Sequence, residues 1–199
     1  MNDPTEDNTR KADTAQRRST LSNLTSGLAL SVSIFALAIG AWQTRLMQGQ
    51  ARASVWPFIA MGYTYNSNTD MNGFVWHVDN NGVGPAKVET VTLSIDGKPM
   101  KRWTDVLAEL GLHHRSLNVS TSSLSGDVIP PNLNRETTIE ALRINDREVA
   151  TLFKGAIDRF KMDICYCSVY DECWVAHWQQ TKVDSVHRCD ATGLTLFED

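Results

Sequence analysis

One uncharged, apolar segment constrains this chain more than any other feature. No charged residue occurs between Arg18 and Arg45, and residues 24–42 read LTSGLALSVSIFALAIGAW. As an α-helix this segment would be about 28 Å long, close to the hydrocarbon thickness of a bilayer. A core helix of a soluble domain would carry a polar stripe, whereas only small Ser, Thr and Gly residues interrupt this segment. The sequence therefore predicts a transmembrane helix at 24–42.

Basic residues on the two sides of this segment predict its orientation. Four Lys or Arg residues precede it and only Arg45 and Arg52 follow closely, so the positive-inside rule places the N-terminus in the cytoplasm. Residues 1–23 are rich in charged and polar side chains and are expected to form a disordered cytoplasmic tail. Residues 43–54 are a juxtamembrane segment. Residues 55–199 then form a single exported domain.

The same segment allows two further hypotheses. Ala36-Leu37-Ala38 matches the small-residue pattern of a cleavable signal peptide. The apolar run continues past it and the preceding residues are not net positive, which favours an uncleaved signal anchor. Gly27 with Ser31, and Ala36 with Gly40, are pairs of small residues spaced for close helix packing, which raises the hypothesis of a homodimer through the transmembrane helix.

The charge balance excludes one class of partner. Residues 1–52 contain six Lys or Arg residues and four acids, so the residues after Arg52 carry a net charge of −6, compared with −4 for the whole chain. A domain of this sign repels phosphate groups. We therefore expect no nucleic-acid partner.

Short alternating runs after residue 54 predict a mainly β domain. We expect strands at 55–65, 74–78, 89–95, 117–124 and 137–142, and a further strand from Phe160. Two short helices are expected at 103–110, capped by Thr104 and ended by Gly111, and at 145–154, capped by Asn145 and ended by Gly155. The predicted fold is a single N-terminal transmembrane helix followed by a β-sandwich with one or two short helices.

Residues 74–97, FVWHVDNNGVGPAKVETVTLSIDG, carry a family resemblance. A strand, then Asn-x-Gly-x-Gly-Pro-Ala, then a strand ending in Asp-Gly resembles immunoglobulin-like (Ig-like) modules of the CARDB type on exported bacterial proteins. The whole layout is similar to a group of uncharacterised bacterial single-pass membrane proteins. The resemblance implies an Ig-like sandwich on the periplasmic side of a bacterial inner membrane. It implies no functional residue.

Three of the four cysteines lie within residues 165–174, CYCSVYDECW. Cysteines of an exported domain usually pair as disulfides. In a strand from Phe160, the apolar side chains share one face, and Cys165 and Cys167 lie on the opposite, charged face. A five-residue loop would place Cys167 opposite Cys173, which leaves Cys165 for Cys189. The disulfide candidates are therefore Cys167–Cys173 and Cys165–Cys189.

The cysteines and nearby histidines also allow a metal hypothesis. The alternative ligand set is Cys165, Cys167, Cys173, His177, His187 and Cys189, which has enough soft ligands for zinc. Its spacing matches no compact zinc module, and exported thiolates tend to be oxidised first. We therefore expect no metal or other cofactor. A metal- or redox-responsive envelope sensor remains the alternative function.

The remaining candidate sites favour a structural interpretation. His113–Arg115 is expected to be a solvated loop, and Ser120–Ser125 a polar strand or loop without a nucleophile motif. Trp76, Trp174 and Trp178 are expected in the core rather than in a ligand-binding platform. No catalytic motif is present. The leading hypothesis is a noncatalytic interaction module that binds a protein or other envelope partner, and a hydrolase with an unfamiliar polar pocket is the further alternative.

Overall fold

The computed structural model describes residues 4–66, 73–112, 118–132 and 138–198, with side chains described from Thr25 onward. The chain divides into two compact units, Met1–Ala51 and Arg52–Asp199. The first unit is helical, and helix α1 spans Pro4–Ala53. The helix thus begins within the predicted disordered tail (residues 1–23). Pro4 suits a first helical position, and no Gly or second Pro interrupts the chain before Gly27.

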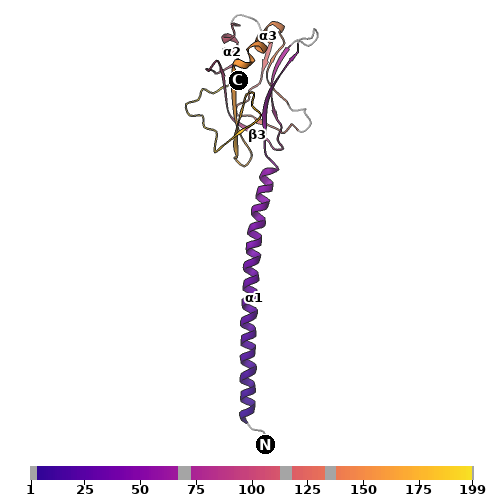
Figure 1. Cartoon of the computed structure of the whole chain (residues 1–199), viewed down its shortest axis with the longest axis vertical. Coiled ribbons are helices and arrows are strands. Elements are labelled where there is room, and N and C mark those ends of the chain that lie inside the picture. Colours follow the sequence, from indigo (N-terminus) through magenta and orange to yellow (C-terminus); the bar gives the residue numbers. More distant parts are fainter. Residues whose placement is uncertain (1–3, 67–72, 113–117, 133–137, 199) are drawn as a thin grey trace. The chain divides into compact units, whose positions relative to one another are not determined.

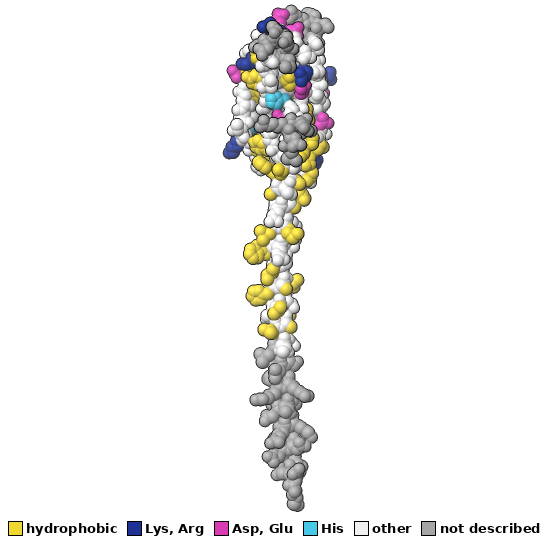
Figure 2. Space-filling view, turned by 90° about the vertical axis from the view of Figure 1, so that its right-hand side faces the viewer, with side chains coloured by type: hydrophobic (Ala, Val, Ile, Leu, Met, Phe, Trp, Pro, Cys, Tyr) yellow, Lys and Arg dark blue, Asp and Glu magenta, His cyan; other side chains and the backbone are white. Residues whose placement is uncertain are grey.

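The Thr25–Ala53 part of α1 is long and apolar enough to cross a membrane. Its large apolar side chains are exposed, including Leu28 (69%) and Leu37 (74%), and Figure 2 shows them projecting from the described part of the helix. The hydroxyls of Ser31, Ser33 and Thr44 donate to carbonyls one turn earlier, so these polar groups are satisfied within the helix. The surface of this segment therefore suits a lipid environment.

The second unit is mainly β, as predicted. Its ten strands in the described residues form two antiparallel sheets, one ordered β1-β2-β7-β5 and one ordered β10-β9-β8-β3-β4, with β6 pairing to β3. Figure 1 shows the short helices α2 and α3 at the same end of this domain. The strands are β1 Ile59–Asn66, β2 Gly73–Asn80, β3 Ala86–Ile95, β4 Lys98–Met100, β5 Val119–Thr121, β6 Val128–Ile129, β7 Ile139–Ile144, β8 Phe160–Cys167, β9 Cys173–His177 and β10 Asp184–Val186.

The two sheets share one apolar core. Phe74, Trp76 and Val78 of β2 are fully buried, as their alternation predicts. The Trp76 ring lies 5.3 Å from the ring of Phe160 and 4.3 Å from that of Trp178, both contributed by the other sheet or its continuation. Trp76 and Trp178 therefore build the core rather than a ligand platform, and Trp174 is half-buried beside Tyr166.

The short helices are close to the predicted ones, but their caps differ. Helix α3, Arg147–Ala156, is capped by Asp146, whose carboxylate accepts from the Val149 amide, so the predicted cap at Asn145 is wrong by one residue. Gly155 does not end α3, because the chain continues through it into the 3-10 turn Ile157–Arg159.

Helix α2, Trp103–Glu109, begins with a different cap from the predicted Thr104. The Asp105 carboxylate accepts from the backbone amides of Lys101 and Arg102. Gly111 does end α2, with a φ of +83° that favours glycine.

The buried side chain of Asn80 joins three segments of the domain. Its Oδ1 accepts from the amides of Phe58 and Gly82, and its Nδ2 donates to the carbonyls of Gly84 and Ile129, at 2.7–3.0 Å. All four hydrogen-bonding positions of the amide group are thus used. The side chain fixes the start of β1, the β2–β3 turn and β6 to one another.

The two glycines of the same turn allow the backbone to approach closely. A Cβ atom on Gly82 would lie 2.4 Å from the Trp56 carbonyl oxygen, and one on Gly84 would lie 2.0 Å from that of Val55. Both distances are too short for any side chain. The Asn-x-Gly-x-Gly pattern is therefore a packing motif. The glycines let the turn pack closely, and this close packing brings the turn within hydrogen-bonding distance of the Asn80 side-chain amide.

Replacing Asn80 with Ala is expected to destabilise the domain by about 3 kcal/mol, because two backbone donors and two backbone acceptors lose their buried partner. Thermal unfolding of the full chain in detergent, followed by tryptophan fluorescence, measures the change. Asn81→Ala is the matched control, since this neighbouring side chain is exposed. Equal melting temperatures for the two variants would contradict this account.

Candidate functional site

The outward face of the four-stranded sheet carries a polar groove. The groove has a volume of about 750 Å³ and lies on the side of the sheet opposite the core. It is lined by side chains from β1, β2 and β7 and by residues that flank β7. The lining residues are Thr64, Asn66, Gly73, Val75, His77, Asp79, Thr138, Glu140, Arg143 and Asn145.

Strand alternation and one irregularity place these side chains together. Val75, His77 and Asp79 point outward because their neighbours on β2 are buried in the core. His77 pairs with Glu140 of β7, and Trp76 pairs with Leu142, so the register shifts by one residue between them. This bulge turns Glu140 and Arg143 to the same face, although regular alternation would separate residues three apart.

An ion pair occupies one side of the groove. The Arg143 guanidinium donates through two nitrogens to the two carboxylate oxygens of Glu140, with Nε 2.5 Å from Oε2. This hydrogen bonding holds the pKa of Glu140 below its usual value and raises the pKa of Arg143. Glu140 is therefore ionised at neutral pH and unsuited to act as a proton donor.

Asp79 and His77 form the centre of the groove. Asp79 Oδ1 accepts from the Thr138 hydroxyl at 2.7 Å and from the Asn132 side-chain amide at 3.1 Å. The other carboxylate oxygen lies 3.6 Å from Nε2 of His77. A Cβ on Gly62 would be 2.6 Å from the same Nε2, so the glycine leaves the space that the imidazole occupies. The orientations of both groups are thus set by their neighbours.

This arrangement suits binding better than covalent catalysis. With a neutral His77, the side chains of Asp79, Glu140 and Arg143 give the groove a formal charge of −1. The hydroxyls among its described lining residues belong to Thr64 and Thr138, and Thr138 already donates to Asp79. The groove offers carboxylate, amide and hydroxyl groups to a polar or basic ligand.

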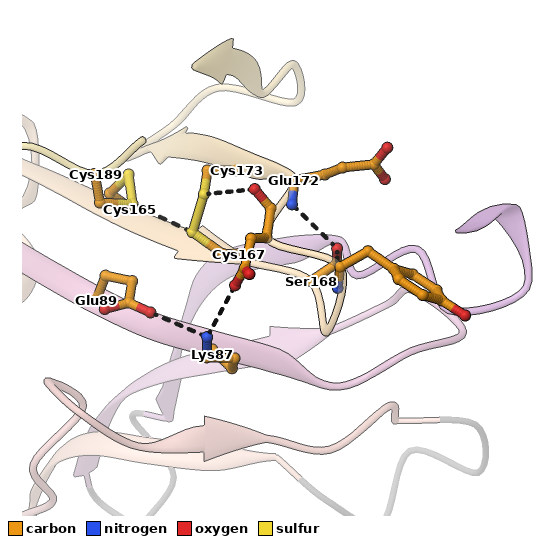
Figure 3. Close-up of a disulfide and its surroundings, with 10 residues drawn as sticks. Lys87, Glu89, Cys165, Cys167, Ser168, Glu172, Cys173 and Cys189 are labelled. Carbon is orange, nitrogen blue, oxygen red and sulfur yellow. Dashed lines mark hydrogen bonds and ion pairs between the residues drawn. A yellow bond between two sulfur atoms is a disulfide. The ribbon is translucent and has the colours of Figure 1, made fainter. Parts of the chain in front are cut away.

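A second chemically distinct feature lies on the outward side of the six-stranded sheet. Disulfides join Cys165 to Cys189 and Cys167 to Cys173, the two pairs that the strand phase predicts. Figure 3 shows the four cysteines gathered beside β8 and β9, with Lys87 on the neighbouring strand. Cys167 and Cys173 are directly opposite in the ladder, with Cα atoms 4.0 Å apart.

The environment of the cysteines differs from the open charged face that the sequence suggests. Cys165, Cys167 and Cys173 are at most 7% exposed. The chain after β10 crosses this side of the sheet, and the amide of Phe197 donates to the carbonyl of Val91 on β3. The C-terminal segment therefore covers a face that alternation alone predicts to be solvated.

The structure does not assemble the six-residue metal set. Among the described residues, the sulfurs of Cys167, Cys173 and Cys189 lie within 4.8 Å of one another, but each belongs to a disulfide and offers no thiolate. His177 lies elsewhere, with Nδ1 2.7 Å from Asp163 and Nε2 3.2 Å from Asp184.

The other sequence candidates contribute little to either site. His187 is exposed, and His113–Arg115 lies outside the described residues. Most of Ser120–Ser125 is exposed around the short strand β5, as expected for a polar segment.

Sequence reasoning missed the groove. The polar alternation at His77 and Asp79 was a visible signal for an outward face. Glu140 and Arg143 could not be added to it, because the bulge that aligns them depends on the pairing of β2 with β7.

No protein-family model, curated protein or solved structure matches this chain. The proposals that follow rest on its own residues and their geometry.

Replacing Cys189 with Ser is expected to lower the stability of the domain. The Cys165–Cys189 bridge spans 24 residues of sequence, and the loss of such a cross-link costs about 3 kcal/mol on the chain-entropy model. Thermal unfolding of the full chain without reductant measures the effect. Cys173→Ser, which opens a bridge that spans only 6 residues, should cost less, and the reverse order would contradict the model.

Intact-mass measurement provides a direct check on the pairing. Protein purified without reductant should gain four hydrogen atoms on reduction, two for each bridge. An unchanged mass would show that the thiols are free, and the metal hypothesis would then regain its ligands.

Proposed function

We propose that this chain is a membrane-anchored, noncatalytic binding module. A signal anchor holds an Ig-like sandwich on the periplasmic side of a bacterial inner membrane, where the domain binds a protein segment or other envelope partner. The observation that carries the proposal is the groove of His77, Asp79, Glu140 and Arg143, on a domain joined to an apolar helix.

The anchor is supported by the uninterrupted apolar surface of α1. A helix that packs in a soluble core buries one side, whereas the Thr25–Ala53 part of α1 is not buried in this structure. The two disulfides of the β domain support an oxidising compartment, because bridges of this kind seldom persist in the cytosol. Together these features favour an N-terminus in the cytoplasm and an exported C-terminal domain.

The side chains of the groove favour a ligand that carries hydrogen-bond donors and a basic group. Asp79 and Glu140 are carboxylates in a half-enclosed setting, and Arg143 is already paired with Glu140. Among the described lining residues, the basic side chain beside Asp79 is the His77 imidazole, 3.6 Å away, and Arg143 is paired with Glu140 instead, so a cationic side chain of a partner would meet an Asp79 carboxylate that has no Lys or Arg beside it in the groove. A bound polypeptide segment with a Lys or Arg residue fits this pattern.

The proposed topology makes a direct prediction. Alkaline phosphatase fused after Asp199 should be active in a bacterial host, because this enzyme folds only when exported. A fusion to a reporter that works only in the cytoplasm should be inactive. The opposite result would place the cysteines in a reducing compartment and remove the support that the disulfides give.

Binding in the groove can be tested by photocrosslinking in native membranes. A photoreactive amino acid at Val75, on the groove floor, should give a discrete crosslinked product. The matched position is Leu152, which is 45% exposed on α3 and does not line the groove. A product from Leu152 alone, or the same product from both positions, would argue against the groove.

Asp79→Asn tests the chemistry of the interaction. The amide preserves the shape and keeps an acceptor for Thr138 and Asn132, but it removes the charge. Loss of one charged hydrogen bond is expected to weaken crosslinking from Val75 about tenfold. Asn145→Ala, a change at the margin of the same groove, should weaken it less, and an unchanged yield for Asp79→Asn would exclude a cationic ligand group.

A further inference from the structure

The two disulfides lie close enough to exchange partners. Sγ of Cys189, in one bridge, is 3.8 Å from Sγ of Cys167, in the other. We propose that the cluster is a thiol–disulfide exchange site for a dithiol reductant. Once the Cys165–Cys189 bridge is opened, Cys189 forms a new disulfide with Cys167, and the Cys167–Cys173 bond breaks. This inference is independent of the groove and of its ligand.

Cys189 is held in place without its own disulfide. Before it, β10 pairs with β9, and Val186 lies opposite Cys173. After it, the Phe197 amide donates to the Val91 carbonyl at 2.8 Å, and the Phe197 ring is 1% exposed and packs 5.0 Å from the ring of Trp103. The segment is thus fixed on both sides, so a released Cys189 thiolate stays beside Cys167.

Exposure decides which sulfur a reductant reaches first. Cys165, Cys167 and Cys173 are buried, whereas Cys189 is only partly buried, on the C-terminal segment. Thiol–disulfide exchange requires the incoming thiolate to reach one sulfur of the bridge. The Cys165–Cys189 bridge is therefore opened first, by attack on Cys189.

Reduction of the Cys165–Cys189 bridge takes place in two displacements, and its atoms and electrons balance. One thiolate of the dithiol bonds to Cys189, and Cys165 leaves as a thiolate. The second thiolate of the dithiol then bonds to the first, and Cys189 leaves. The dithiol has become a disulfide and has supplied two electrons, and Cys165 takes a proton from water.

The exchange that follows between Cys189 and the Cys167–Cys173 bridge consumes no further electrons. The Cys189 thiolate bonds to Cys167, the Cys167–Cys173 bond breaks, and Cys173 leaves as a thiolate that takes a proton from water. Lys87 is the ladder neighbour of Cys167, and its ammonium is paired with the carboxylates of Asp171 and Glu89 on this side of the sheet. Its hydrogen bond with Asp171, at 3.3 Å, raises the pKa of Lys87 and keeps it charged.

The exchange transfers a constraint from one element to another. In the starting protein, the Cys167–Cys173 bridge closes the β8–β9 hairpin, and Cys189 fastens the C-terminal segment. In the product, the C-terminal segment remains fastened to β8 through Cys167, and the hairpin at residues 168–172 loses its bridge. Input of two electrons thereby loosens this hairpin without releasing the C-terminus.

The first experiment uses the unaltered full chain in detergent. Less than one equivalent of dithiothreitol is added, free thiols are blocked with N-ethylmaleimide, and peptides are mapped by mass spectrometry without further reduction. Chymotryptic cleavage after Tyr166 and Tyr170 separates Cys165, Cys167 and Cys173. The expected one-bridge product contains Cys167–Cys189 with blocked Cys165 and Cys173. Recovery of only the original bridges would overturn the proposal.

A pair of variants tests the same step without any reductant. In Cys165→Ser, the free Cys189 thiol should exchange, so that the Cys167–Cys189 and Cys167–Cys173 bridges are both found. In the matched Cys189→Ser variant, the free thiol should remain on Cys165 and the bridge should remain Cys167–Cys173. Exchange in neither variant, or equally in both, would show that the position of Cys189 has no special role.

Discussion

The amide of Asn80 is the interaction on which the arrangement of the β domain depends. A buried amide is costly unless every donor and acceptor is satisfied, and here four backbone groups from three separate segments meet it. The partners extend from Phe58 at the entry to β1 to Ile129 in β6. Because Gly82 and Gly84 let the turn approach closely, the start of β1 is fixed to the β2–β3 turn and to β6, which belongs to the other sheet.

The groove lies on the outward face of β2, the strand that Asn80 ends. Asn80 ends β2 on the buried face, so His77 and Asp79, three residues and one residue before it, both point outward. The bulge opposite His77 then brings Glu140 and Arg143 to the outward face. The apolar core and the polar groove are thus opposite sides of one ladder, and a shift of register would lose both.

The disulfide cluster lies on the other sheet and depends on different contacts. Cys165 and Cys167 occupy alternate positions on β8, and the C-terminal segment lies over them because Phe197 inserts into the core. A ligand in the groove and a reductant at the cysteines would therefore act on separate outward faces. The proposed function, a tethered binding domain with a redox-dependent hairpin, combines the two faces.

Local sequence determined the apolar helix, the mainly β character of the domain and the phase of β8 that pairs the cysteines, because these depend on residues a few positions apart. It could not supply the groove, since Glu140 reaches His77 only through the pairing of β2 with β7 and through a bulge that alternation does not predict. It also misjudged the exposure of Cys165, which a distant segment covers. Tertiary structure decided these features because each requires a contact between residues far apart in the chain.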